Sequence, residues 1–541
     1  MSEHGDRHGD RHGADGEPGG RGRQGGQGGP GGQGGARGDR NGRRDAAGRQ
    51  RPASRAAGVP AARTAQAPRD RRRGGDASRT AAFDVLRDIA ESDAYANLVL
   101  PPMLRSRGIT GRDAAFATEL TYGTLRLQGR YDMVIALAAA RPIAAIDPPV
   151  LDLLRLGVHQ LLGMRVPAHA AVSETVGLAR ARVGAGAAQF VNAVLRKVSA
   201  TAPEEWLAQV ADGAGADEVD RLAAVHSHPG WITRSLRQAL VADHREPNEL
   251  EALLVADNTA PAVTVVARPG LAVREDVLAS VADGVPGRWT PTAVVLHGGD
   301  PSAVPGVRDG RVGVQDEGSQ LVALALAAVP VEARADGSST GERWLDLCAG
   351  PGGKAALLGA MAALRGAHLV ANEVQPHRAL LVERAVAAVP AGTVTVRCAN
   401  GLDAGRDEPG VYDRVLVDAP CTGLGALRRR PESRWRRVPG DLGPLTELQR
   451  GLLGSALDAV RPGGVVAYVT CSPHLAETQL VVRDVLKRRD DVEQIDAREA
   501  VREVAGPDIP LGDGPHVQLW PHVHGTDGMH LALLRKRLND A

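Results

Sequence analysis

Two cysteines stand at the ends of short apolar runs, where a thiol can act on a bound ligand. Cys421 follows the run at residues 414–417, and Cys471 follows the run at residues 465–469, which Pro462-Gly463-Gly464 is expected to introduce as a turn. Such runs, bounded by turn residues, are typical of strands in a parallel sheet covered on both faces. Ligands of these sheets bind beyond the carboxyl ends of the strands, so both cysteines are expected at a site, where a thiolate is a nucleophile. The alternative is that each is a small buried side chain, the usual position of a free cysteine.

The surrounding pattern predicts the elements that position these cysteines. Short apolar runs alternate with segments of helical periodicity from residue 311 to residue 541. This alternation indicates a doubly wound, mainly parallel sheet. Strands are expected at 343–348, 368–373, 393–398, 412–418 and 465–471, and helices at 354–364, 376–388 and 445–460. Cys398 falls in the third of these strands and is expected in the core.

A glycine-rich loop follows the first predicted strand. Residues 348–354 read CAGPGGK, which lacks both the GxxxxGK[ST] spacing of a phosphate loop and the GxGxxG spacing of a dinucleotide loop. A Gly-rich loop alone is weak evidence for a ligand. Glu373 strengthens it, because an acid at the end of the second strand is placed to bind a pair of ribose hydroxyls. A nucleoside without phosphates, such as S-adenosylmethionine, fits this pattern better than NAD.

The rest of the chain divides by composition. Residues 1–75 hold 16 arginines, no lysine and 8 acidic residues, whereas the other 466 residues hold 49 basic and 56 acidic residues. The tail lacks aromatic residues and is expected to be disordered, either as an RNA-binding arm or as a solvating extension. Residues 76–200 have helical periodicity and are predicted to form a helical domain, and residues 203–310, with strands expected at 263–266 and 293–296, a linker and a small α+β module. Four cysteines and no long apolar run favour a cytoplasmic protein without a membrane span.

Several motifs resemble known families. Residues 122–126, 156–161, 167–174 and 190–196 resemble the helical RNA-binding domain of the NusB type, across most of 78–198. CAGPGGK at 348–354, DAPCTG at 418–423 and TCSP at 470–473 together resemble the RsmB/Nop2/Sun family of RNA 5-methylcytosine methyltransferases. The motifs stand in the family's order and are jointly specific. The combination with the NusB-like domain is that of the RsmB-type members, which implies a Rossmann-like catalytic domain and 16S ribosomal RNA as substrate.

The resemblance implies a role for each matched residue. The nucleophile that adds to C6 of cytosine falls on Cys471, the cysteine that assists release on Cys421, and the group beside N3 on Asp418. Lys354 is expected to bind substrate or to lower a thiol pKa. Asn400 stands where the family has an aspartate beside the adenine, and Asp403 is a possible substitute. The cofactor-binding set is Cys348, Ala349, Gly350, Pro351, Gly352, Gly353, Lys354, Glu373, Asn400 and Asp418.

An arginine-rich stretch follows the DAPCTG motif. Arginines with one tryptophan offer phosphate neutralisation and a stacking ring, and the alternative is a solvated loop. The RNA contacts predicted here are Arg428, Arg429, Arg430, Arg434 and Trp435.

The sequence therefore predicts a monomeric, S-adenosylmethionine-dependent cytosine-C5 methyltransferase of ribosomal RNA, without a metal. One alternative is a non-catalytic RNA-binding assembly factor with a decayed methyltransferase domain. Intact Cys471, Asp418 and the Gly-rich loop argue against this reading, and only Asn400 favours it. A second alternative, a DNA cytosine methyltransferase, would place the nucleophile on the Pro-Cys motif, and the NusB-like domain disfavours it.

Overall fold

The computed structural model describes residues 76–92, 94–334 and 341–538. The predicted tail, residues 1–75, lies outside the described residues. In the described part of the chain, no helix is both long enough and apolar enough to cross a membrane.

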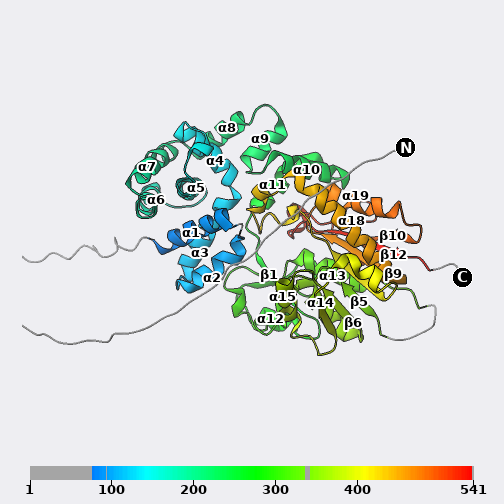
Figure 1. Ribbon diagram of the computed structural model, residues 1–541. Helices are drawn as coiled ribbons and strands as arrows, with labels where there is room; N and C mark the ends of the chain where they lie inside the picture. Colours follow the sequence, from blue (N-terminus) through cyan, green and yellow to red (C-terminus); the bar gives the residue numbers. More distant parts are fainter. Residues whose placement is uncertain (1–75, 93, 335–340, 539–541) are drawn as a thin grey trace, which may run out of the picture. The chain divides into compact units, whose positions relative to one another are not determined.

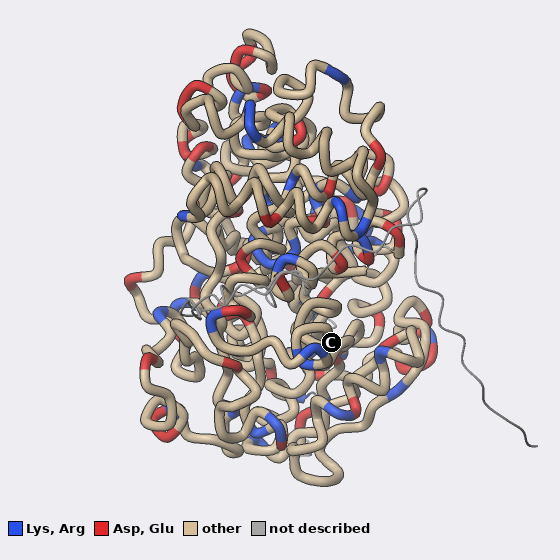
Figure 2. Tube along the Cα trace, turned by 90° about the vertical axis from the view of Figure 1, so that its left-hand side faces the viewer, with Lys and Arg blue, Asp and Glu red and all other residues tan. Residues whose placement is uncertain are grey.

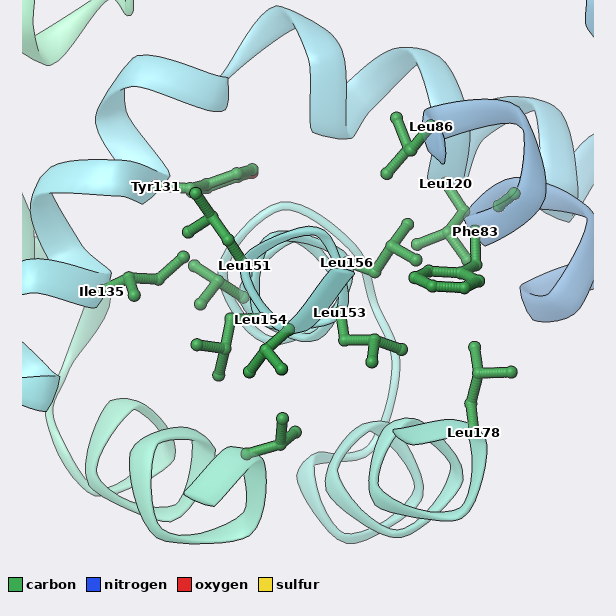
Figure 3. Close-up of a cluster of buried hydrophobic side chains, with 14 of the residues drawn as sticks. Phe83, Leu86, Leu120, Tyr131, Ile135, Leu151, Leu153, Leu154, Leu156 and Leu178 are labelled. Atoms are coloured by element: carbon green, nitrogen blue, oxygen red, sulfur yellow. The ribbon is translucent and has the colours of Figure 1, made fainter. Parts of the chain in front are cut away.

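Helices occupy the described chain up to residue 200, as predicted. α5 runs through their middle, and its apolar residues face in every direction, as in a helix buried on all sides. Figure 3 shows Leu151, Leu153 and Leu156 of α5 pointing towards side chains from the neighbouring helices. The helices are α1 (Ala77–Ser92), α2 (Ala96–Ser106), α3 (Gly111–Arg126), α4 (Gln128–Ala139), α5 (Pro148–Leu162), α6 (Ala168–Arg182) and α7 (Ala185–Ala200).

Further helices and a small antiparallel sheet follow (Figure 1). The helices are α8 (Pro203–Gly213), α9 (Glu218–Val225), α10 (Gly230–Ala242), α11 (Leu250–Asn258) and α12 (Arg274–Ala279). The strands are β1 (Val263–Ala267), β2 (Gly284–Pro286), β3 (Ala293–Leu296) and β4 (Val312–Val314), in the order β2-β3-β1-β4. Strands were predicted at the positions of β1 and β3. β4 pairs with β1, so the small sheet extends past residue 310, where the sequence placed the boundary of the catalytic domain.

The large sheet contains every strand that the sequence predicted after residue 340. The parallel strands are β5 (Arg343–Asp346), β6 (His368–Asn372), β7 (Val394–Arg397), β8 (Tyr412–Asp418) and β9 (Val460–Thr470). Three antiparallel strands were not predicted: β10 (Val492–Ile495), β11 (Val517–Gln518) and β12 (His530–Lys536). The order is β10-β12-β9-β8-β5-β6-β7, with β11 beside β12. β5 and β8 are neighbours at the centre, as in a doubly wound sheet.

Helices cover both faces of the large sheet. Alternate residues of β9 face opposite sides: Val465, Ala467 and Val469 pack in one apolar cluster, Val466 and Tyr468 in another. The first cluster includes residues of α13 (Glu317–Ala328), α14 (Gly353–Arg365) and α20 (Ala497–Ala505), and the second includes α18 (Leu442–Ala459) and α19 (Gln479–Leu486). Burial on both faces therefore explains why the strands of the large sheet are almost continuously apolar.

One predicted turn is part of a strand. Pro462-Gly463-Gly464 was interpreted as the turn before a strand at 465–471, but β9 begins at Val460. Its pairing with β8 shifts between Tyr412↔Val460 and Arg414↔Val465, which is a bulge. Gly463 has a φ of +77°, a conformation that glycine adopts without strain. Beyond the bulge the register is regular, so β8 and β9 end at the same edge of the sheet.

Candidate active site

Cys421 and Cys471 lie together beyond the carboxyl ends of β8 and β9. Their Sγ atoms are 3.4 Å apart, within range of a sulfur hydrogen bond. Cys471 directly follows β9, and the short segment after β8 brings Cys421 beside it. Parallel pairing of two neighbouring strands is what joins residues that are 50 positions apart in the sequence.

The two thiols differ in acidity. The hydrogen bond from Cys421 lowers the pKa of Cys471, although burial opposes this, and the positive charges of Lys354 and Arg430 act in the same direction. The same hydrogen bond raises the pKa of Cys421 well above its ordinary value, and burial adds to the effect. The pair therefore favours a thiolate on Cys471 that accepts a hydrogen bond from the Cys421 thiol. Since the thiolate is the reactive form of cysteine, this geometry makes Cys471 the more reactive of the two thiols.

An ion pair stands beside the thiols. Lys354, in the first turn of α14, donates from Nζ to Asp418 Oδ2 at 2.9 Å, and Asp418 ends β8. Burial favours the neutral amine, but the Asp418 carboxylate raises the pKa of Lys354, and the negative charge of Cys471 contributes. The ammonium group is thus kept charged next to Cys471.

The glycine-rich loop connects β5 with α14 and touches Glu373 just after β6. The Gly350 N–H donates to Glu373 Oε2 at 3.1 Å, and the Gln375 N–H donates to Oε1 at 2.9 Å. A Cβ atom on Gly350 would lie 2.1 Å from Oε2 and would displace the carboxylate. Gly352 begins the helix at a φ of +107°, where a Cβ atom would meet Ala385 at 2.5 Å. The loop and Glu373 therefore form one hydrogen-bonded unit that depends on two glycines.

The remaining loop positions differ in their exposure to solvent. Burial raises the pKa of Cys348, which keeps this thiol neutral. Ala349 is buried, and its N–H donates to the Asn372 carbonyl at 2.8 Å. Pro351 is exposed, and Gly353 is the first residue of α14.

Asp346 is a member of this site that the sequence analysis missed. It ends β5, is fully buried, and has no hydrogen-bond partner for either carboxylate oxygen. Burial and the neighbouring charge of Asp418 raise its pKa to about 8. An unpaired buried carboxyl requires an explanation, and a cationic ligand at the loop would provide one. Its position at the end of the first strand, directly before the glycine-rich loop, was the available signal.

We expect Asp346→Asn to stabilise the protein increasingly as pH rises. The pKa of Asp346 is 3.8 in the unfolded chain and about 8 in the folded protein, so the folded state holds the proton more tightly. Stability therefore falls as pH rises from 3.8 through about 8. The amide cannot ionise and escapes this loss. Thermal unfolding should show a gain of roughly 5 °C near pH 8 and roughly a third of that gain near pH 5. The exposed Asp490→Asn is the control, and an equal gain at both pH values would contradict the pKa assigned to Asp346.

Asn400 and Asp403 lie just past β7. Asn400 is exposed, and its Oδ1 accepts from the Leu402 N–H at 3.2 Å, which caps a local turn. Asp403 is paired with Arg406 at 3.0 Å. The expected contact of either residue with an adenine stays a prediction. Cys398, expected in the core, is instead exposed, because β7 ends at Arg397 and Cys398 lies beyond the sheet.

The predicted arginine-rich RNA contact needs correction. Arg428 and Arg429 are paired with Asp316 and Asp527, at distances of 2.6–3.1 Å. These carboxylates come from segments about 100 residues away, which the sequence pattern does not reveal. Arg428 is buried and Arg429 is largely covered, so both serve the interior of the fold.

Arg434 and Trp435 are also internal contacts. Arg434 is fully buried and donates to the carbonyls of Arg126 and Ser227 and to Asn258 Oδ1. Trp435 is half-buried, and its ring lies so close to Gly129 that a Cβ atom on this glycine would be 2.2 Å from the ring.

Among the five predicted contacts, Arg430 alone is exposed. Its guanidinium lies over the Tyr95 ring at 5.3 Å, and its charge lowers the pKa of Cys471.

A mainly parallel sheet with a glycine-rich loop of non-phosphate type after its first strand and an acid after its second strand defines the class of Rossmann-like methyltransferases. Comparison with known proteins agrees. Residues 337–535 match the model of the 16S rRNA methyltransferase RsmB/F family, and residues 76–200 match the NusB family. The chain belongs to the RsmB/F methyltransferase family, with an N-terminal NusB-type domain.

Individual relatives extend over most of the chain. A putative methyltransferase, MT1451, of Mycobacterium tuberculosis (strain CDC 1551 / Oshkosh) is 52% identical over 86% of this chain and 98% of its own length. The ribosomal RNA small subunit methyltransferase B of Pseudomonas putida is 32% identical over 81% of this chain and 96% of its own. The crystal structure of PH0851 shares the fold, with a TM-score of 0.69 and 21% identity over 85% of this chain and 99% of that one.

Proposed function

We propose that this protein transfers a methyl group from S-adenosylmethionine to C5 of a cytosine in 16S ribosomal RNA. The observation that carries the proposal is the pair of thiols at 3.4 Å, with one pKa lowered and the other raised. C5 of cytosine is a poor nucleophile until a thiolate adds to C6. A site that prepares one thiolate and keeps a second thiol protonated beside it suits this addition and its reversal.

The residues at the glycine loop fit the cofactor. S-adenosylmethionine, when bound, supplies the electrophilic methyl group. Glu373 offers a carboxylate to the ribose hydroxyls, and the unpaired carboxyl of Asp346 offers a partner for positive charge. Gly350 and Gly352 let the backbone approach a ligand closely. Asn400 is proposed for the adenine side, where its amide oxygen can accept from an amino group.

The cytosine would react beside the carboxyl ends of β8 and β9. Cys471 Sγ forms a bond to C6, which makes C5 electron-rich. C5 would then form a bond to the methyl group, whose bond to the sulfonium sulfur breaks and leaves its electron pair on that sulfur. The Asp418–Lys354 pair holds the N3 edge and stabilises charge there during the addition. The C5 proton then passes to a proton acceptor, the Sγ–C6 bond breaks, and the double bond between C5 and C6 re-forms. We assign assistance in this release to Cys421, whose Sγ lies beside that of Cys471.

The proposal also covers partner and setting. Figure 2 shows basic and acidic residues interspersed over the side that it presents. RNA affinity would therefore come from the NusB-type domain, from Arg430 and from the arginines of residues 1–75. The four cysteines are free, which suits a reducing cytoplasm, and we propose a monomer there.

Bisulfite sequencing of ribosomal RNA tests this function. Cells that lack the gene should lose protection at one cytosine of 16S ribosomal RNA, because 5-methylcytosine resists the conversion that unmodified cytosine undergoes. Complementation with the unaltered gene should restore protection, and the Cys471→Ala gene should not. Full protection in the deletion strain would refute the proposed substrate, and restoration by Cys471→Ala would favour a different nucleophile.

A further inference from the structure

Glu477 is a buried carboxylate behind the two cysteines. It lies in the short 3-10 turn η8 (Leu475–Glu477), six residues after Cys471, and its side chain is fully buried. Oε1 accepts from the Thr422 N–H at 2.8 Å and from Gln449 Nε2 at 3.2 Å. Oε2 accepts from Ser472 Oγ at 2.7 Å and from Thr422 Oγ1. Nothing in the proposed reaction uses this group directly.

The partners of Glu477 connect the two cysteine segments. Thr422 is the residue after Cys421, and Ser472 is the residue after Cys471. Their hydroxyl oxygens lie 3.2 Å apart, and both bond the same carboxylate oxygen. Gln449 of α18 also donates to the Pro420 carbonyl at 2.8 Å, directly before Cys421. The carboxylate therefore fixes the positions from which both thiols project.

All of these donors are neutral groups. Four donors on two oxygens fill the accepting capacity of an ionised carboxylate, which has no proton of its own to place. The hydrogen bond with Cys471 and burial raise the pKa of Cys421, and the charge of Glu477 adds to this increase. The other charged groups that face the thiols act on Cys471: Lys354 and Arg430 lower its pKa, and Asp418 raises it. Tyr468 faces Cys421 as well, and burial raises its own pKa, so the phenol is neutral.

We propose that Glu477 is a positioning residue that clamps the two cysteine segments together and keeps the shared proton on Cys421, so that Cys471 is the thiolate. The inference deepens the proposed function and rests on it for its catalytic consequence. The assignment of the proton to Cys421 depends only on the free protein, because neither RNA nor cofactor takes part in the four hydrogen bonds of Glu477.

Competitive alkylation tests the position of the proton. The full chain is treated with iodoacetamide across a range of pH, and initial rates at Cys421 and Cys471 are read by peptide mass spectrometry. Alkylation should strongly prefer Cys471 in the unaltered protein. Glu477→Gln keeps the shape but removes the charge and half of the accepting capacity. The preference should then fall by about tenfold or more, with Cys421 reacting at lower pH than before.

Two further variants complete the test. Glu447→Gln removes an exposed carboxylate on α18 and should leave the preference unchanged. Ser472→Ala removes one bond of the clamp but leaves the charge, so we expect a kcat lowered by about fivefold or more, an unchanged KM for RNA and an unchanged alkylation preference. This second variant tests the clamp by itself if Glu477→Gln does not fold. An unchanged preference in Glu477→Gln, or an unchanged kcat in Ser472→Ala, would overturn the proposal.

The outcomes separate the inference from the function beneath it. A protein with the expected alkylation pattern but without methyl transfer to RNA would refute the function and leave the proton assignment standing. An active enzyme whose Glu477→Gln variant keeps both its preference for Cys471 and its turnover would refute only the inference about Glu477.

Discussion

Cys421→Ala will accumulate a covalent protein–RNA complex, whereas Cys471→Ala will form none. If Cys471 attacks C6, its removal stops the reaction before any bond to RNA exists. If Cys421 assists release, its removal still permits attack and methyl transfer, but the product stays attached to Cys471. The 3.4 Å separation of the Sγ atoms and their opposite pKa shifts support this division of roles.

A denaturing gel with RNA substrate and S-adenosylmethionine reads out both variants. We expect a slowly migrating band from Cys421→Ala and a turnover lowered by about 100-fold or more in each variant. Cys398→Ala is the matched control. Cys398 is exposed beyond β7, so this variant should retain full activity. A band from Cys471→Ala alone would reverse the roles, and active variants without any band would end the covalent mechanism.

Glu373→Ala will lower the affinity for S-adenosylmethionine by about 10- to 100-fold. A hydrogen bond to a charged group contributes about 1.5–3 kcal/mol, and the ribose hydroxyls would lose their charged acceptor. The Gly350 N–H would lose its partner as well, which loosens the loop. Isothermal titration calorimetry measures the change directly.

Two companion variants limit the interpretation. Glu383→Ala removes an exposed carboxylate from α15 (Pro376–Val386) and should bind normally. Asn400→Asp restores the charge expected beside an adenine and should bind equally or more tightly. Unchanged affinity in Glu373→Ala would refute its assignment, and a large loss in Asn400→Asp would remove that residue from the cofactor site.

The sequence by itself determined the class of the catalytic domain and the order of its parts. The parallel strands are buried on both faces, so each is a short apolar run that composition reveals. Turn residues and loop motifs at the strand ends therefore placed Cys421, Cys471 and Glu373 at one edge of the sheet. β10 and β12 escaped prediction because the apolar pattern of β12 suits a strand or a helix equally, and β10 is only four residues long.

Only the tertiary structure decided which charged residues serve the site and which serve the fold. Arg428 and Arg434 resemble RNA contacts in sequence, yet their partners come from segments far away in the chain. Glu477 and Asp346 are both fully buried, which the sequence does not report: the Glu477 carboxylate accepts four hydrogen bonds, whereas the Asp346 carboxylate is left without a partner in the described chain. A charge's role depends on its partners and its distance from water, and sequence spacing reports neither.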